Sequence, residues 1–136
     1  MNIFLCCSKH FYDKIPPIKE ALERAGHTIT PPNSYDEPFK EEEIKEVGSE
    51  EHREWKAAMM RRQEPKIRAN DAILVLNFEK KGVANYVGGA TFLEMFKAFE
   101  LGRKIFLYHP IPESILTDEI NGFGPVVIYG DLGKVK

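Results

Sequence analysis

The segment from Gly88 to Glu94 has the residue types and spacing best suited to chemistry in this chain. Its two adjacent glycines let the backbone come close to a ligand, and the unpaired N–H groups at the start of a helix favour an anion or an oxygen-rich sugar. Glu94 lies in or just after the first turn of the helix expected there. The helix field at that position stabilises the ionised carboxylate, which suits a nucleophile rather than an acid. The alternative is that Glu94 only complements the helix dipole, for about 0.3–1 kcal/mol, and touches no substrate.

Other catalytic patterns are weaker or missing. The glycines are not followed by a phosphate-loop lysine, and the dinucleotide pattern G-x-G-x-x-G does not occur. Cys7 and His10 are close enough in sequence to suggest a cysteine hydrolase, but no third residue presents itself. The four histidines are scattered without the spacing of metal ligands. We therefore predict neither a metal nor a cofactor.

A second carboxylate, Asp71, precedes the most apolar segment of the chain. Asp at the entrance to a strand commonly caps a turn or hydrogen-bonds nearby backbone. From the residues alone, both this structural role and a catalytic role are open.

The apolar pattern predicts alternating strands and helices. The strands are expected at residues 3–7, 27–30, 72–76, 105–108 and 126–128, and the helices at 16–25, from 49 onward and at 90–101. Pro65 should kink or divide the helix that begins at Ser49. Residues 31–48 look irregular, as in a lid or binding loop, and the run Glu41-Glu42-Glu43 within them is typical of a solvated surface.

This alternation is typical of an α/β fold with a parallel sheet covered on both faces. We expect a flavodoxin-like or Rossmann-like three-layer sandwich with a central, mainly parallel five-stranded sheet. Ligands bind such folds at the carboxyl ends of the strands. Ser8, Asn77, the two glycines and the start of the helix carrying Glu94 should gather there.

The central part of the chain resembles the nucleoside 2-deoxyribosyltransferase family. The resemblance is carried by NDAILVLN at residues 70–77, GGATFLE at 88–94 and LGRK at 101–104, and more weakly by Asn33-Ser34-Tyr35. In that family the glutamate matching Glu94 attacks the anomeric carbon of a deoxyribosyl group, and the aspartate matching Asp71 helps to handle the base. The resemblance thus implies transfer of a 2-deoxyribosyl group between nucleobases through a covalent glycosyl-enzyme on Glu94.

The chain departs from that family at two places. Where the transferases often have a tyrosine that hydrogen-bonds the glutamate, this chain has Phe4, for which Tyr12 or Tyr35 would have to substitute. The loop before Gly88 is longer, and Asn85 stands where a second base-contacting acid is expected. The predicted catalytic residues are Glu94 and Asp71. The predicted substrate-binding residues are Ser8, Tyr35, Asn77, Asn85, Gly88 and Gly89.

Two other functions remain open. One is hydrolysis of a nucleoside 5′-monophosphate, as in glycosidases that resemble the transferases in this core, with Ser8 and the glycine turn binding phosphate. The other is a nucleotide-binding module that has lost turnover, which Phe4 in place of tyrosine favours.

Composition restricts the kinds of partner. With 136 residues and 43% hydrophobic content, the chain is expected to form a single domain, residues 1–136. The net charge of -2 gives no overall attraction to a nucleic-acid polymer or an anionic membrane, so the expected ligand is a small nucleoside or nucleotide. The apolar run at residues 3–7 is too short for a membrane span or a secretion signal, which indicates a cytoplasmic protein.

The helix at 90–101 has only a narrow polar face. A monomer of this size would struggle to cover Phe92, Met95, Phe96 and Phe99 together with Trp55 and Met59. We therefore expect a homo-oligomer, a dimer or higher, built in part on this helix. The resemblance implies the same, because the transferases complete each pocket with residues from a neighbouring subunit.

Overall fold

The centre of the molecule is a sheet of five parallel strands. The computed structural model describes residues 1–136 and gives the strand order β2-β1-β3-β4-β5. The strands are β1 (Asn2–Cys6), β2 (Thr28–Thr30), β3 (Ala72–Val75), β4 (Lys104–Leu107) and β5 (Val126–Val127). This is the strand order of flavodoxin-like folds, so the predicted fold class is confirmed. Each strand lies within one or two residues of its predicted bounds.

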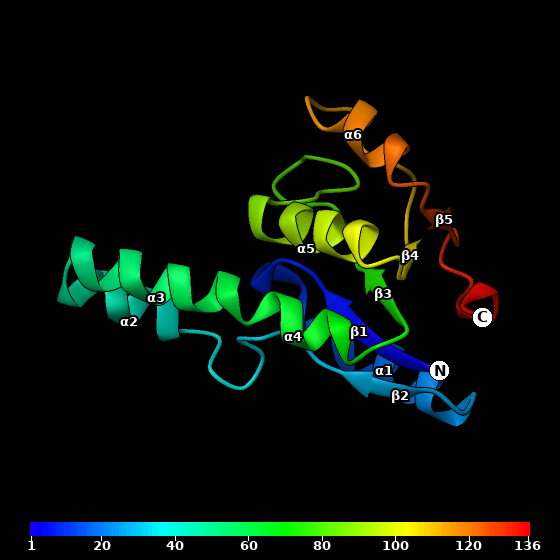
Figure 1. The fold of residues 1–136 in the computed structure, drawn as a ribbon, viewed down its shortest axis with the longest axis horizontal. Helices are drawn as coiled ribbons and strands as arrows, with labels where there is room; N and C mark the ends of the chain where they lie inside the picture. The colour runs from blue at the N-terminus through cyan, green and yellow to red at the C-terminus, as the bar shows by residue number, and fades with distance from the viewer.

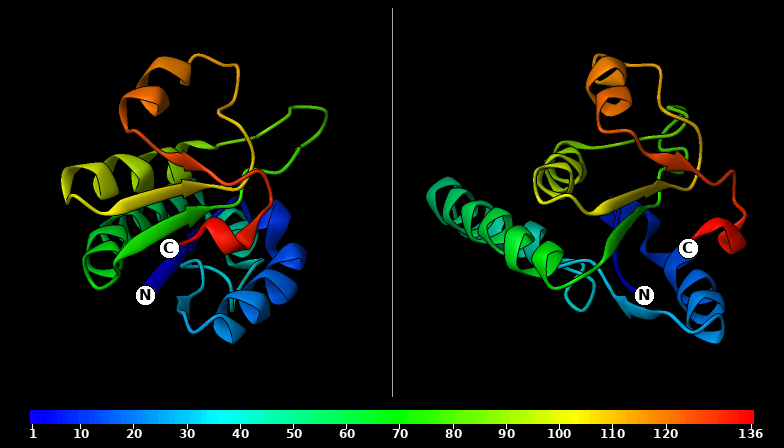
Figure 2. Two further views of the ribbon diagram at one scale, coloured as in Figure 1. Left: turned by 90° about the vertical axis from the view of Figure 1, so that its right-hand side faces the viewer. Right: turned by 45° about the vertical axis from the view of Figure 1, so that its right-hand side comes forward.

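Helices cover both faces of the sheet, which makes three layers (Figure 2). Along β1, Ile3 and Leu5 point into the core beneath α1 (Ile15–Arg24), whereas Phe4 and Cys6 point to the opposite face. That second face is covered by α4 (Gln63–Arg68), α5 (Gly89–Glu100) and α6 (Thr117–Gly122). Because both faces are buried, the central strands are apolar runs rather than alternating ones.

Helices α2 (Lys40–Val47) and α3 (Ser49–Arg61) form a hairpin that projects from the sheet (Figure 1). The prediction that residues 31–48 are irregular throughout is wrong for their second half. The segment KEEEIKEV has few apolar residues, so it lacks the periodicity that reveals a buried helix. The division at Pro65 is confirmed, since α3 ends at Arg61 and α4 begins at Gln63, with Pro65 in the first turn of α4, where its missing N–H costs nothing.

Three short elements complete the chain. They are η1 (Lys9–Lys14), α6 and η2 (Leu132–Lys134), and the apolar pattern predicted none of them. None of the helices combines the length and the apolar character that crossing a membrane requires.

Candidate active site

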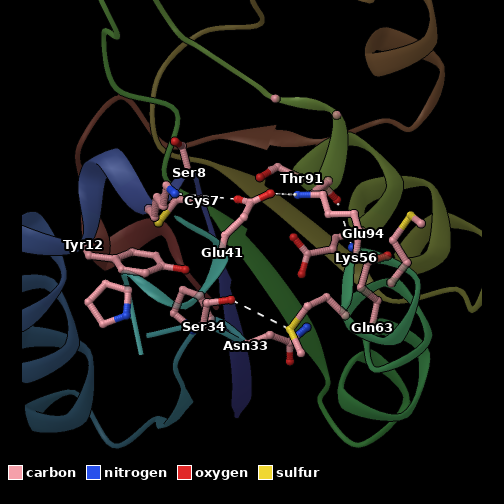
Figure 3. A pocket seen from close by; sticks show the side chains of 18 of the residues that line it. Cys7, Ser8, Tyr12, Asn33, Ser34, Glu41, Lys56, Gln63, Thr91 and Glu94 are labelled. Atoms are coloured by element: carbon pink, nitrogen blue, oxygen red, sulfur yellow. Dashed lines mark hydrogen bonds and ion pairs between the residues drawn. The ribbon is translucent and has the colours of Figure 1, made fainter. Parts of the chain in front are cut away.

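A cavity of about 260 Å³ opens at the carboxyl ends of the strands, where ligands of such folds bind. One wall comes from the loop after β1, with Cys7 and Ser8, and from the segment after β2, with Asn33 and Ser34. Much of the rest of the lining comes from α3 and from the first turns of α5 (Figure 3). The volume is close to the lower end of the usual range for ligand pockets, about 300–1,000 Å³, which matches a nucleoside-sized ligand.

Glu94 lines this cavity from the second turn of α5 and is 7% exposed. Burial raises the pKa of its carboxyl to about 8, against the positive charge of Lys66 and a contact with the Cys6 thiol, both of which lower it. The sequence predicted a carboxylate ionised by the helix field. That prediction is wrong, because α5 begins at Gly89 and its field falls off within the first turn, so desolvation dominates.

Both predicted glycines lie at the cavity. Gly88 is the N-cap of α5 in extended conformation, and a side chain there would approach the Tyr86 hydroxyl to 3.1 Å. Gly89, the first residue of the helix, has open space around it. Together they let the start of α5 form part of the cavity wall.

Ser8 also lines the cavity, and a lysine accompanies it. Lys80, from the loop between β3 and α5, donates a hydrogen bond of 3.3 Å to Ser8 Oγ. The same lysine lies over the ring of Tyr86, 4.7 Å from its centroid. Lys9 and Lys56 line the cavity as well, so its lining carries three cations.

Four other predicted site residues lie elsewhere. Asp71 stands at the amino end of β3, on the opposite edge of the sheet, and accepts a 2.7 Å hydrogen bond from the Asn2 backbone N–H. Asp71 thus lies away from Glu94, and its hydrogen bond to nearby backbone is the structural role that the sequence left open. Asn77 is fully buried, and its amide joins the ends of β3 and β4 through hydrogen bonds with the backbone of His109 and Pro110. Both of its N–H groups are used within the chain, and Asn77 does not line the cavity.

Tyr35 and Asn85 do not line the cavity either. Tyr35 packs against the ring of Tyr12, at 5.5 Å between centroids, and against the core under α1. Asn85 has a φ of 55°, so it serves the backbone turn before α5, a conformation that Asn tolerates better than most residues.

The residues considered around Glu94 take different places. Phe4 is buried in the core beneath α5, away from the cavity, whereas Tyr12 lines it. Cys7 lines the cavity too, but burial, followed by the charge of Glu94, raises the pKa of its thiol to about 12. A nucleophilic cysteine requires the opposite shift, and His10 does not line the cavity, so the cysteine hydrolase loses its support.

The cavity also contains residues that the sequence did not predict as site residues. They are mainly on the α2–α3 hairpin and in the loop after β3, and include Glu41, Trp55, Lys56, Met59 and Lys80. Gln63, at the start of α4, is 8% exposed and donates a 3.2 Å hydrogen bond to the Ala90 carbonyl, which ties α4 to the start of α5. Only α3 gave a sequence signal for this part of the cavity. Trp55 and Met59 form an apolar face on an otherwise charged helix, and that face lines the cavity.

Comparison of the chain with known protein families and with curated proteins finds no match.

Proposed function

We propose that this chain is a glycosyltransferase that moves a 2-deoxyribosyl group between nucleobases through a covalent intermediate on Glu94. The observation that carries the proposal is the position of Glu94, a single buried carboxyl in a nucleoside-sized cavity at the ligand-binding edge of the sheet. The resemblance of residues 70–77 and 88–104 to the nucleoside 2-deoxyribosyltransferase family supports the same reaction.

In this reaction a Glu94 carboxylate oxygen bonds to the anomeric carbon while the bond from that carbon to the base nitrogen breaks. The base leaves with the electron pair and takes up a proton. A nitrogen of a second base then attacks the same carbon, releases the carboxylate and loses its proton. A carboxylate both stabilises an oxocarbenium-like centre and can bond to it, which is why this residue type suits the reaction.

The raised pKa gives the proposal a pH signature. A nucleophilic carboxylate must be ionised, so kcat/KM for base release should rise about tenfold per pH unit below pH 8 and level off above it. If Glu94 instead acted as an acid that protonates the leaving base, activity would fall above pH 8. A pH profile of base release from 2′-deoxyadenosine, recorded from pH 5 to pH 10, separates the two roles.

The decisive test combines a variant with product partitioning. Glu94→Gln, and equally Glu94→Ala, should abolish base release because a neutral side chain cannot attack the anomeric carbon. For the unaltered chain, rising concentrations of a second free base should produce new β-nucleoside at the expense of free deoxyribose, since two inversions retain the configuration. Base release that is unchanged in Glu94→Ala would reject the mechanism. Free sugar that forms at a constant rate without any exchanged nucleoside would reject transfer.

A second candidate is hydrolysis of a nucleoside 5′-monophosphate, and the Lys80–Ser8 hydrogen bond is the observation that favours it. Lysine and hydroxyl groups beside a helix N-terminus are suitable partners for a phosphate. Competition by inorganic phosphate should weaken base release if the enzyme uses monophosphates and leave it unchanged if it uses nucleosides. Tight binding of a nucleotide with no base release on long incubation would instead indicate a module without turnover.

We further propose that the protein forms a homo-oligomer through the outer face of α5. Leu93, Phe96 and Phe99 remain 42–50% exposed on that face, although the Phe123 ring packs near both phenylalanines. Exposed apolar patches of this kind mark interaction sites. Light scattering at micromolar concentration should give at least a dimer, which Phe99→Lys should weaken, and a monomer would contradict the proposal.

A further inference from the structure

Glu41 reaches the cavity from the first turn of α2 and joins three elements. Its carboxylate accepts a 2.9 Å hydrogen bond from His52 Nε2 and a 3.3 Å one from Lys56 Nζ, both on α3. It also lies 3.6 Å from Lys9 Nζ of η1, on the other side of the cavity. Figure 3 shows Glu41 and Glu94 extending into the same space.

This side chain is a fixed negative charge. Only 17% of it is exposed, which by itself raises the pKa of the carboxyl, but the hydrogen bond from His52 and the charge of Lys56 outweigh burial and hold the pKa at about 2. The other acid at the cavity apart from Glu94 is Glu37, which is exposed. Glu41 is thus the acid lining the cavity that pairs with its lysines.

The groups that bind Glu41 are those that would otherwise bind a phosphate. Lys9 and Lys56 both line the cavity, as does Lys80 with its hydrogen bond to Ser8. A carboxylate and a phosphate oxygen use the same charge-assisted hydrogen bonds. Glu41 therefore occupies, from within the chain, two of the three lysines that could bind an anionic ligand.

We propose that Glu41 is a specificity-determining residue that excludes phosphorylated ligands, so that the cavity accepts the neutral nucleoside and rejects its 5′-monophosphate. The inference rests on the proposed reaction of Glu94 and selects between its two candidate substrates. The relevant residues are Glu41 itself and the lysines at 9 and 56 that it occupies.

The discrimination has a simple electrostatic origin. A phosphate dianion that enters must either displace Glu41 from its partners Lys9, His52 and Lys56 or remain beside it as a like charge in a partly buried site, and both are unfavourable. A 5′-hydroxyl carries no charge and incurs neither cost. Lys9 then serves to tie α2 to η1, and Lys56 serves to tie α2 to α3, rather than to bind substrate.

The experiment compares Glu41→Gln with a matched control. Glu42→Gln removes the neighbouring charge on the same helix, which also pairs with Lys9 but is half-exposed and outside the cavity. Both variants and the unaltered chain are titrated calorimetrically with inorganic phosphate and with 2′-deoxyadenosine 5′-monophosphate. Base release from 2′-deoxyadenosine and from its monophosphate is measured in parallel, and circular dichroism verifies that each variant is folded.

For Glu41→Gln we expect at least a tenfold gain in affinity for inorganic phosphate and a tenfold rise in the ratio of kcat/KM for monophosphate to that for nucleoside. Glu42→Gln should change either value less than twofold. The double variant Glu41→Gln/Lys56→Gln should lose most of the gain in phosphate affinity, because one of the freed cations is gone. This double variant also reports on Glu41 if the single variant loosens the hairpin.

Two results would overturn the inference. One is an unaltered chain that already binds phosphate as tightly as Glu41→Gln or prefers the monophosphate, and the other is an equal gain in Glu42→Gln. The binding arm does not depend on turnover. If no variant releases base from either substrate, the proposed reaction fails while the phosphate titration still decides the role of Glu41.

Discussion

The sheet and the α2–α3 hairpin both contribute to the lining of one cavity, but they are stabilised in different ways. Residues Ile3–Cys6 of β1 and all of β3 have no exposed surface, whereas neither α2 nor α3 contains a single buried residue. The sheet wall is held by packing on both faces and carries α5 with Glu94. The hairpin wall is held largely by charge, through Glu41, His52 and Lys56. The residue proposed for chemistry thus stands on the half of the site that is packed into the core, and the residue proposed for selection stands on the half without buried residues.

The sheet and the hairpin should differ most in how much unfolding free energy is lost when an apolar side chain is truncated. Leu74, fully buried in the central strand, should lose about 2–5 kcal/mol of unfolding free energy on replacement by Ala, because a cavity remains in the packed core. Val47 at the end of α2 is 69% exposed, and Val47→Ala should change that free energy by less than about 0.5 kcal/mol. Urea unfolding measures both, and comparable losses would show that the hairpin is packed as firmly as the sheet.

The same difference explains which parts of the molecule the sequence could predict. Buried strands are unbroken apolar runs bounded by polar residues, so β1 and β3, and through them the edge where Ser8 and Glu94 meet, follow from local pattern. Helix α2 has no buried face and thus no periodic signal, which is why Glu41 looked like part of a solvated acidic run. Lys80 reaches Ser8 across 72 residues of chain, a contact that no local pattern encodes.

Polar residues at strand ends were the other source of error. Asp71 and Asn77 flank the same strand, and residue type alone does not distinguish a ligand-binding side chain from one that satisfies nearby backbone. Which edge of the sheet each residue occupies depends on strand direction. Asp71 precedes β3 and so lies at the amino edge, away from Glu94, a consequence that the predicted parallel sheet already contained. Asn77 does lie at the carboxyl edge, but its amide is used by the backbone after β4.

A second prediction concerns the charge on the half that is packed into the core. The folded-state pKa of Glu94, about 8, is above the ordinary value of 4.5, so the folded state retains a proton that the unfolded state has lost between these values. Glu94 therefore favours folding below pH 4.5, and this contribution is lost as pH rises through 8. Glu94→Gln removes the ionisation. The variant should gain stability relative to the unaltered chain between pH 5 and pH 9, by a few kcal/mol at about 1.36 kcal/mol per pKa unit.

Thermal unfolding of both chains across this range provides the test. The difference in Tm should grow with pH and level off above pH 8. A constant difference would mean that Glu94 ionises normally in the folded protein, and it would also remove the basis for the rise in activity towards pH 8.

A smaller effect is expected at the amino edge of the sheet. Asp71→Asn weakens the hydrogen bond to the Asn2 N–H that fixes the start of β1 against β3, which should cost about 1 kcal/mol because the pair is exposed. Activity at saturating nucleoside should not change, since Asp71 lies away from the cavity. A loss of activity that varied with the leaving base, at unchanged Tm, would instead place Asp71 at the substrate.

Removing the ion pairs of Glu41 in the hairpin should change global stability least. Its effect should be confined to α2 and α3. Each ion pair of Glu41 is partly exposed and contributes at most about 1 kcal/mol, and no buried residue of α2 or α3 depends on it. Glu41→Gln should therefore leave the urea midpoint almost unchanged while amide hydrogens of α2 and α3 exchange faster. Those of β1 and β3 should keep their protection, because local opening of the hairpin breaks no core contacts.

One molar NaCl should have a similar effect on the unaltered chain, since the screening length falls to about 3 Å, and little effect on Glu41→Gln, whose pairs are already weakened. Hydrogen exchange read by mass spectrometry resolves these segments. If salt and the substitution accelerated exchange equally in the sheet and the hairpin, the two halves would open as one unit, and the hairpin could not move independently of the wall that holds Glu94.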